Sequence, residues 1–232
     1  MKELSQRTVA ITAGIAFFLM TIAALFAYGF ALGHLIAPGD ATATVNQIMA
    51  SPMLLRLTVC SFLIVLLCDV VVAWALYLFL RPVNENLALL MAWLRLMYAA
   101  MLGIAMFNLL KVLLIVSDAD YLTLFTSKAL QAQVFLFLKA FMMEWSAGLL
   151  IFGVHLFLLG YLVLKAGYIP KILGGLLIIG AFCYVTTNFA NLLWSDYEHY
   201  KATLELLLSL PMALGELSFA FWLLFKGGKA VA

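Results

Sequence analysis

The chain has 232 residues, of which 67% are hydrophobic and only 10% are charged, whereas soluble domains average about 45–50% and 25%. This composition excludes a soluble globular protein, and the net charge of +2 without a block of like charges argues against nucleic acid as a partner. Apolar runs longer than about 18 residues predict transmembrane helices. The predicted fold class is therefore all-α: a polytopic membrane protein with six transmembrane helices in one bundle.

Six apolar segments, taken in chain order, are long enough to cross a hydrocarbon core of about 30 Å. Together they form one membrane domain over residues 1–232. The fourth is overlong, because its helical pattern begins near Ser127, so its outer end is expected to extend beyond the membrane or to lie along its surface. The predicted spans cover residues 8–36, 54–80, 87–116, 133–164, 172–194 and 204–225.

A short helix is predicted just after the first span. Asp40 is positioned to cap this helix over residues 41–50, which is apolar enough to lie on the outer membrane surface. The span itself has an alternative interpretation as a cleavable signal peptide, with Ala31-Leu32-Gly33 as the small-residue site. Its apolar part is too long for a signal peptide, so a transmembrane helix is the prediction.

The loop charges predict the orientation, since Lys and Arg are retained in the cytoplasm during insertion. Six spans place both termini on the same side of the membrane. That side collects Lys2, Arg7, Arg81, Lys165, Lys171, Lys226 and Lys229, and the other side collects Asp40, Asp118, Asp120, Asp196 and Glu198. Both termini are therefore expected in the cytoplasm.

Four ionisable side chains are predicted near the middle of the membrane. At about 1.5 Å per residue from the cytoplasmic ends, Asp69, His155 and Glu216 lie roughly 15–17 Å deep. Arg95 lies roughly 12 Å deep, and its long side chain reaches the same layer. Because a charge at this depth costs about 2.5–3.5 kcal/mol, we expect these residues to face the bundle interior, with Arg95 paired to Asp69 or Glu216.

Two interpretations of this midplane layer stay open. In the first, its ion pairs only hold the helices together. In the second, the layer forms the floor of a polar cavity, in which one of the two carboxylates carries a proton. His155 would then belong to a proton relay or to an acid–base pair.

A second polar layer is predicted near the outer surface. It consists of Arg56, Asn108, Lys111, Glu144, Asn188 and Asn191. Helical spacing also predicts polar stripes that descend toward the midplane: Glu144, Gly148, Ile151 and His155 in the fourth span; Gly180, Tyr184, Thr187, Asn188, Asn191 and Ser195 in the fifth; and Glu205, Ser209, Met212 and Glu216 in the sixth. These stripes predict a cavity that opens outward, with the helix over residues 41–50 as its roof.

Not every notable residue fits a single cavity. Arg95 and Lys111 are about 160° apart around the third span. That span can show both residues to one cavity only if it bends, which Gly103 permits.

An outer aromatic belt is expected to contain Trp145, Trp194 and Tyr197. The cysteines match no metal or redox spacing and are expected in the core: Cys60, Cys68 and Cys183.

Short segments along almost the whole chain resemble one family when they are taken together and in order. They are Ala37-Pro38-Gly39-Asp40 with Leu55-Arg56; Leu67-Cys68-Asp69-Val70; Arg81-Pro82-Val83-Asn84; Phe152-Gly153-Val154-His155-Leu156; Gly160-Tyr161 with Gly167-Tyr168-Ile169-Pro170-Lys171-Ile172-Leu173-Gly174; and Leu214-Gly215-Glu216-Leu217 with Trp222-Leu223-Leu224. The family is the domain-of-unknown-function family 4386 of bacterial integral membrane proteins. The resemblance implies a six-span protein of the bacterial cytoplasmic (inner) membrane and implies no activity.

The sequence favours a protein that binds or transports a small or amphiphilic molecule in the outward-opening cavity. One alternative is a structural or regulatory subunit with a buried ion-pair network, in which Gly174, Gly175 and Gly180 pack against a second copy. A lipid-directed membrane enzyme is less favoured, because His155 is the only histidine at depth and no serine or cysteine has a base beside it. We expect no metal and no cofactor, and we expect membrane lipids as partners.

Overall fold

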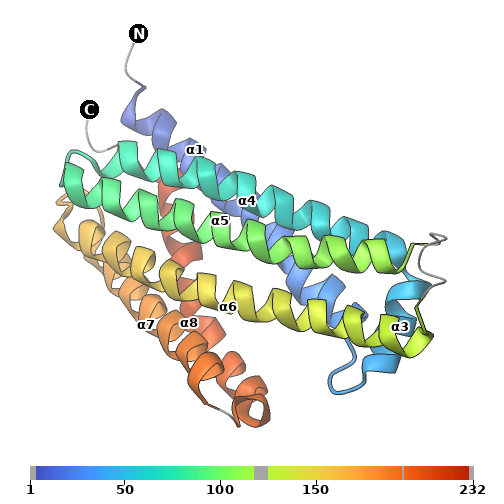
Figure 1. Cartoon of the computed structure of the whole chain (residues 1–232). Coiled ribbons are helices and arrows are strands. Elements are labelled where there is room, and N and C mark those ends of the chain that lie inside the picture. The colour runs from blue at the N-terminus through green and yellow to red at the C-terminus, as the bar shows by residue number, and fades with distance from the viewer. Residues whose placement is uncertain (1–3, 118–124, 195, 230–232) are drawn as a thin grey trace.

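The computed structural model describes residues 4–117, 125–194 and 196–229, without the side chains of Glu198, Ala202 and Glu205. Within these ranges every regular element is a helix (Figure 1). The elements are α1 (Gln6–Ala24), η1 (Leu25–Leu32), α2 (Gly33–Leu35), α3 (Ala41–Ala50), α4 (Pro52–Leu80), α5 (Glu85–Ile115), α6 (Ser127–Lys165), α7 (Lys171–Leu193) and α8 (Tyr197–Phe225).

Six helical segments are long and apolar enough to cross a membrane, which confirms the predicted fold class. The first of them, Gln6–Leu35, joins α1, η1 and α2 into one 30-residue span. The last helix begins at Tyr197, well before the predicted start at residue 204, and within its described residues the stretch Leu206–Phe225 is long and apolar enough to cross a membrane. The protein is therefore an all-helical, multi-pass membrane protein.

Side chains at the helix starts explain where several helices begin. Ser5, Asp40, Asn84 and Thr126 each accept a hydrogen bond from the backbone N–H three residues later, which satisfies a donor that the helix itself leaves unpaired. The predicted cap of the short helix is confirmed, because Asp40 Oδ1 lies 2.9 Å from the Ala43 nitrogen. The capped helix, α3, packs against α4 and α6.

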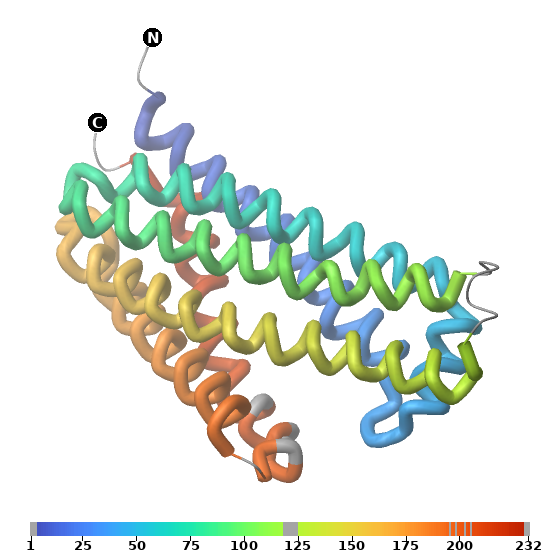
Figure 2. The backbone as a smooth tube through the Cα atoms, viewed as in Figure 1, coloured from blue at the N-terminus to red at the C-terminus, as the bar shows by residue number. Residues whose placement is uncertain are grey.

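The six spans pack as a closed ring in the order α1, α4, α5, α6, α7 and α8, with α8 returning to α1. The ring is closed near the two termini, which lie at the same end of the molecule (Figure 1). There the Arg7 guanidinium donates to the backbone carbonyls of Leu223, Leu224 and Gly227 at distances of 3.3, 2.6 and 2.9 Å. At the opposite end α7 and α8 diverge from the other helices (Figure 2). The ring is therefore wider at that end.

Helix α6 has 39 residues, which at about 1.5 Å per residue exceeds the thickness of a hydrocarbon core. Its end farthest from the termini lies beside α3 (Figure 1). This agrees with the expectation that the overlong span extends beyond the membrane.

Glycines let α6 and α7 approach closely. A Cβ atom on Gly160 would lie 2.9 Å from the Gly174 carbonyl oxygen, and one on Gly174 would lie 2.8 Å from the Gly160 oxygen. Gly180 likewise faces Leu156 and the backbone at Met212. Gly174 and Gly180 are thus used within the chain, whereas a Cβ atom on Gly175 would meet open space. Of the three glycines expected to pack against a second copy, only Gly175 is free to do so, and a homo-oligomer stays a prediction.

Candidate functional site

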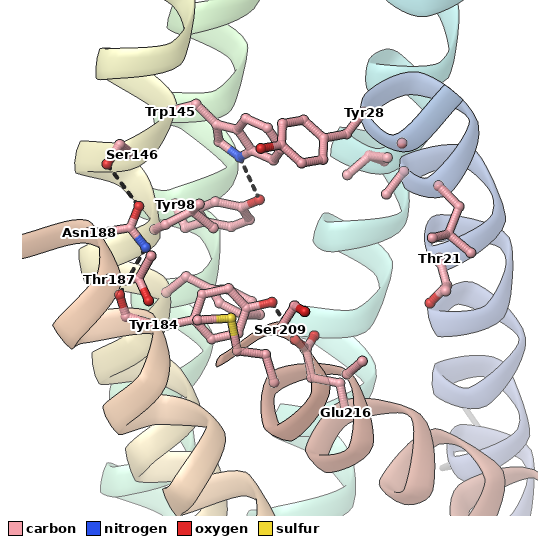
Figure 3. A pocket seen from close by; sticks show the side chains of 18 of the residues that line it. Thr21, Tyr28, Tyr98, Trp145, Ser146, Tyr184, Thr187, Asn188, Ser209 and Glu216 are labelled. Atoms are coloured by element: carbon pink, nitrogen blue, oxygen red, sulfur yellow. Dashed lines mark hydrogen bonds between the residues drawn. The ribbon is translucent and has the colours of Figure 1, made fainter. Parts of the chain in front are cut away.

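A cavity of about 720 Å³ lies inside the ring, and all six spans contribute to its lining. Most of its wall is apolar or aromatic. The polar side chains that line it are Thr21, Tyr28, Asp69, Tyr98, Trp145, Ser146, Tyr184, Thr187, Asn188, Asn191, Tyr197, Lys201, Ser209 and Glu216. Figure 3 labels several of these side chains, which enter one space from different helices, with Tyr28 and Trp145 at one end and Glu216 at the other.

A buried ion pair lies beside the cavity. Arg95 Nη2 is 2.7 Å from Asp69 Oδ1, and both side chains are fully buried. Of the two predicted partners of Arg95, the structure thus pairs it with Asp69. Asp69 lines the cavity, and within the described residues its Oδ2 atom accepts no hydrogen bond.

Arg95 is held from several sides. Its Nη1 lies 3.1 Å from His155 Nε2, and its guanidinium lies 4.9 Å from the Phe17 ring centroid and 5.4 Å from that of Phe152. These distances suit cation–π interactions that supplement the ion pair. Arg95 and His155 do not line the cavity, whereas Asp69 does. We call Asp69, Arg95 and His155 the charged core.

The hydrogen bonds of His155 define its protonation state. Its Nδ1 is 2.8 Å from the Met91 carbonyl oxygen, which can only accept, so Nδ1 carries the hydrogen. Its Nε2 faces the Arg95 guanidinium, which can only donate, so Nε2 accepts. The imidazole is therefore neutral and uses both nitrogens to hold Arg95. This geometry gives His155 a positioning role and does not bring it to the cavity as a relay.

Glu216 has different partners from Asp69, although both line the cavity. The Tyr184 hydroxyl donates to Glu216 Oε1 at 2.8 Å (Figure 3). Among the described residues no Lys or Arg side chain lies within ion-pair distance of Glu216. One carboxylate is thus neutralised by arginine, and the other is held by a neutral hydroxyl.

The wall between α6 and α7 is a short hydrogen-bond network. Ser146 donates to Asn188 Oδ1 and accepts from Asn191 Nδ2, both at 2.8 Å. Asn188 also donates to the Tyr184 carbonyl at 2.8 Å. Thr187 lines the cavity beside them, and within the described residues its buried hydroxyl has no hydrogen-bond partner.

The predicted outer layer divides into separate groups. Asn188 and Asn191 line the cavity, whereas Arg56, Asn108, Lys111 and Glu144 do not. Asn108 donates to Glu144 Oε2 at 2.8 Å and accepts from Lys111 at 3.3 Å, which forms a cluster between α5 and α6. Arg56 is exposed and apart from both groups.

Two of the predicted polar stripes face the cavity and one does not. Tyr184, Thr187, Asn188 and Asn191 of α7 line it, as do Ser209, Met212 and Glu216 of α8. Ser195 and the Glu205 side chain lie outside the described residues. The α6 stripe was wrong as a cavity face, because Glu144 and His155 bind α5 through Asn108, Arg95 and Met91.

Two further expectations were wrong, for α3 and for Cys60, whereas the argument on Arg95 and Lys111 agrees with the structure. No described residue of α3 lines the cavity, so this helix is not its roof. Arg95 is buried and Lys111 exposed on one continuous helix, so the two do not share one cavity. Cys60 is exposed, whereas Cys68 and Cys183 are buried as expected.

Sequence reasoning missed an aromatic group at the cavity end far from Glu216. Trp145 Nε1 donates to the Tyr98 hydroxyl at 3.3 Å, and the rings of Trp145 and Tyr28 lie 5.0 Å apart (Figure 3). Trp145 thus belongs to the cavity wall, whereas an outer aromatic belt had been expected. Tyr98 follows Arg95 by one helical turn, and this spacing signals a shared face. Tyr28 stands on η1, whose eight residues are π-helical, a rare backbone form that is frequent at functional sites.

The chain matches, over residues 12–227, the model of a family described as Domain of unknown function (DUF4386). The chain belongs to this family. It is also similar to an uncharacterized protein of Archaeoglobus fulgidus, with 36% identity over 168 residues, which are 72% of this chain and 82% of the relative. No solved structure matches the chain. The predicted resemblance is thereby confirmed, and the bacterial origin stays a prediction.

Proposed function

We propose that the protein binds a small amphiphilic molecule in this cavity, either as a binding protein or as a permease. The volume of about 720 Å³ falls within the range of about 300–1,000 Å³ that is usual for small-molecule sites. An apolar wall with a few convergent polar groups is also typical of such sites. The proposal thus has the size and the chemistry of the cavity in its favour.

The observation that carries the proposal is a pair of buried oxygen atoms at the cavity wall. Asp69 Oδ2 and Thr187 Oγ1 lack hydrogen-bond partners among the described residues. A buried acceptor or hydroxyl without a partner costs about 1–3 kcal/mol, so such atoms are rare unless water or a ligand reaches them. Both residues line the cavity, which makes a polar group inside it their natural partner.

We further infer that the cavity is reached from outside the cell and that both termini are cytoplasmic. Lys and Arg gather in the loops and tails at the end of the molecule where the termini lie, which is the charge bias of cytoplasmic segments. Tyr197 and Lys201, at the start of α8, line the cavity and belong to the opposite end. This arrangement supports an outward opening.

The second candidate is a structural or regulatory subunit, and the charged core favours it. An ion pair that is fully buried needs no ligand to explain its presence, because it can fix helix positions by itself. The two candidates differ in whether water and small solutes reach the cavity wall.

Cysteine labelling tests the proposal. In a background without the three native cysteines, Thr187→Cys and Ser209→Cys should react with a small polar thiol reagent added from outside. Both positions line the cavity, and Thr187 is only 7% exposed. Ser218→Cys on the same helix as Ser209 is the control, because Ser218 bonds to the Leu214 carbonyl and does not line the cavity. If both cavity cysteines stay unlabelled in folded protein, the structural subunit becomes the better explanation.

A further inference from the structure

The charges around the cavity are unevenly compensated. Its lining contains two carboxylates, Asp69 and Glu216, and among the described lining residues Lys201 is the only lysine or arginine. Arg95 neutralises Asp69 through direct contact. Among the described residues the hydrogen-bond partner of Glu216 is the neutral hydroxyl of Tyr184. A ligand seated beside Glu216 therefore meets a carboxylate that no described lysine or arginine contacts directly.

Aromatic rings surround the rest of the space. Tyr28, Tyr98, Trp145 and Tyr184 line it, as does Phe152. The faces of such rings attract cations and repel anions, because the π-electrons carry negative charge. The carboxylate and the aromatic wall thus favour the same sign of charge in a ligand.

The cavity also reaches the apolar surface of the molecule. Leu25 of η1 and Leu206 of α8 line the cavity, although 66% and 76% of these residues are exposed. They belong to the first and last spans, which are neighbours in the ring. A ligand dissolved in the outer part of the membrane can therefore reach the cavity between these two spans.

We propose that the ligand is a hydrophobic organic monocation, such as an amphiphilic amine or a quaternary ammonium or phosphonium compound. Its charge lies near Glu216, and its apolar groups pack against the aromatic wall. This inference rests on the proposed function, since it requires that the cavity holds a ligand. A neutral ligand would leave Glu216 without a cation in direct contact, and an anion would be repelled by this carboxylate.

The test compares probes of opposite charge and nearly equal shape. The full-length protein in lipid nanodiscs is titrated with tetraphenylphosphonium or with tetraphenylborate, and binding to empty nanodiscs is subtracted. We expect saturable binding of the cation and none of the anion. Glu216→Gln should weaken cation binding at least about tenfold, because it removes the charge while keeping the shape.

Glu144→Gln is the matched control, because Glu144 is also a carboxylate within a span but does not line the cavity. It should bind the cation as the wild type does. If Glu216→Gln fails to fold, the comparison of the two probes on the wild-type protein still decides the question.

The outcomes separate this inference from the proposed function. Equal or tighter binding of tetraphenylborate, or no saturable binding of tetraphenylphosphonium, overturns the monocation. An unchanged affinity in folded Glu216→Gln overturns it as well. The proposed function falls separately, when the cavity cysteines at positions 187 and 209 stay unlabelled.

Discussion

The charged core and the cavity wall use the same residue types in opposite ways. In the core, Arg95 contacts both Asp69 and His155, and all three side chains are fully buried, with Asp69 Oδ2 left facing the cavity. In the wall, Glu216 and Thr187 border an open space, and the first has a single neutral partner while the second has none among the described residues. Polar groups at membrane depth thus serve the fold where protein groups satisfy them and remain available to a ligand where they do not.

The largest effect is expected from breaking the charged core. Arg95→Leu leaves Asp69 buried without its cation, and such a loss typically costs about 3–5 kcal/mol. Arg56→Leu, the same change at an exposed arginine, should alter the free energy of unfolding little. Unfolding by denaturing detergent, monitored by circular dichroism, measures both.

A second substitution tests which carboxylate depends on Arg95. Adding Asp69→Asn to Arg95→Leu should restore part of the stability, because it removes the stranded charge. Adding Glu216→Gln should restore none, since Glu216 is not the ion-pair partner. Rescue by Glu216→Gln alone would show that the two carboxylates share one network and would remove the distinction between core and wall.

His155→Phe should have the next largest effect. It removes the acceptor for Arg95 and the donor to the Met91 carbonyl, and unsatisfied buried groups of this kind cost about 1–3 kcal/mol. Reaction of a cysteine at position 187 with the polar reagent should not change, because His155 does not line the cavity. Unchanged stability together with altered labelling or ligand binding would assign His155 to the cavity after all.

The spans and the depth of their charges could be predicted from the sequence. Unbroken apolar runs indicate the helices, and counting residues from the span ends nearest the termini brings Asp69, Arg95 and His155 to one layer. The structure joins them through Arg95, which contacts both Asp69 and His155. Depth is predictable because the rise per residue of a helix is nearly constant.

Which side of each helix borders the cavity could not be predicted in the same way. A span that is apolar on all sides gives little periodic signal, so the α6 stripe through Glu144 and His155 could face either α5 or the cavity. The π-helical form of η1 also leaves no residue pattern to detect, yet it carries Tyr28 in the cavity wall. These features depend on packing between helices that are distant in sequence.

A smaller effect is expected in the cavity wall. Ser146→Ala removes two hydrogen bonds to α7, and such bonds in membranes are worth about 0.6 kcal/mol each. The loss of unfolding free energy should therefore be about 1 kcal/mol. Ser209→Ala is the control, since the Ser209 hydroxyl bonds only to its own helix at the Leu206 carbonyl. If Ser146→Ala lowered the free energy of unfolding as much as Arg95→Leu does, the cavity wall would contribute as much to stability as the charged core.

The smallest effect is expected for Thr187→Val. This substitution best distinguishes a cavity wall without bound water from one that ordered water contacts. The two side chains have nearly the same shape, and the buried Thr187 hydroxyl has no hydrogen-bond partner among the described residues. Without ligand, stability should stay unchanged or rise slightly, because an unsatisfied polar group is replaced by an apolar one of equal size. Tetraphenylphosphonium stabilises the folded protein if it binds there, and this stabilisation should persist in Thr187→Val, since the probe offers no hydrogen bond to the hydroxyl. A loss of more than about 1 kcal/mol without ligand would mean that ordered water already satisfies this hydroxyl and that the cavity wall is completed by solvent.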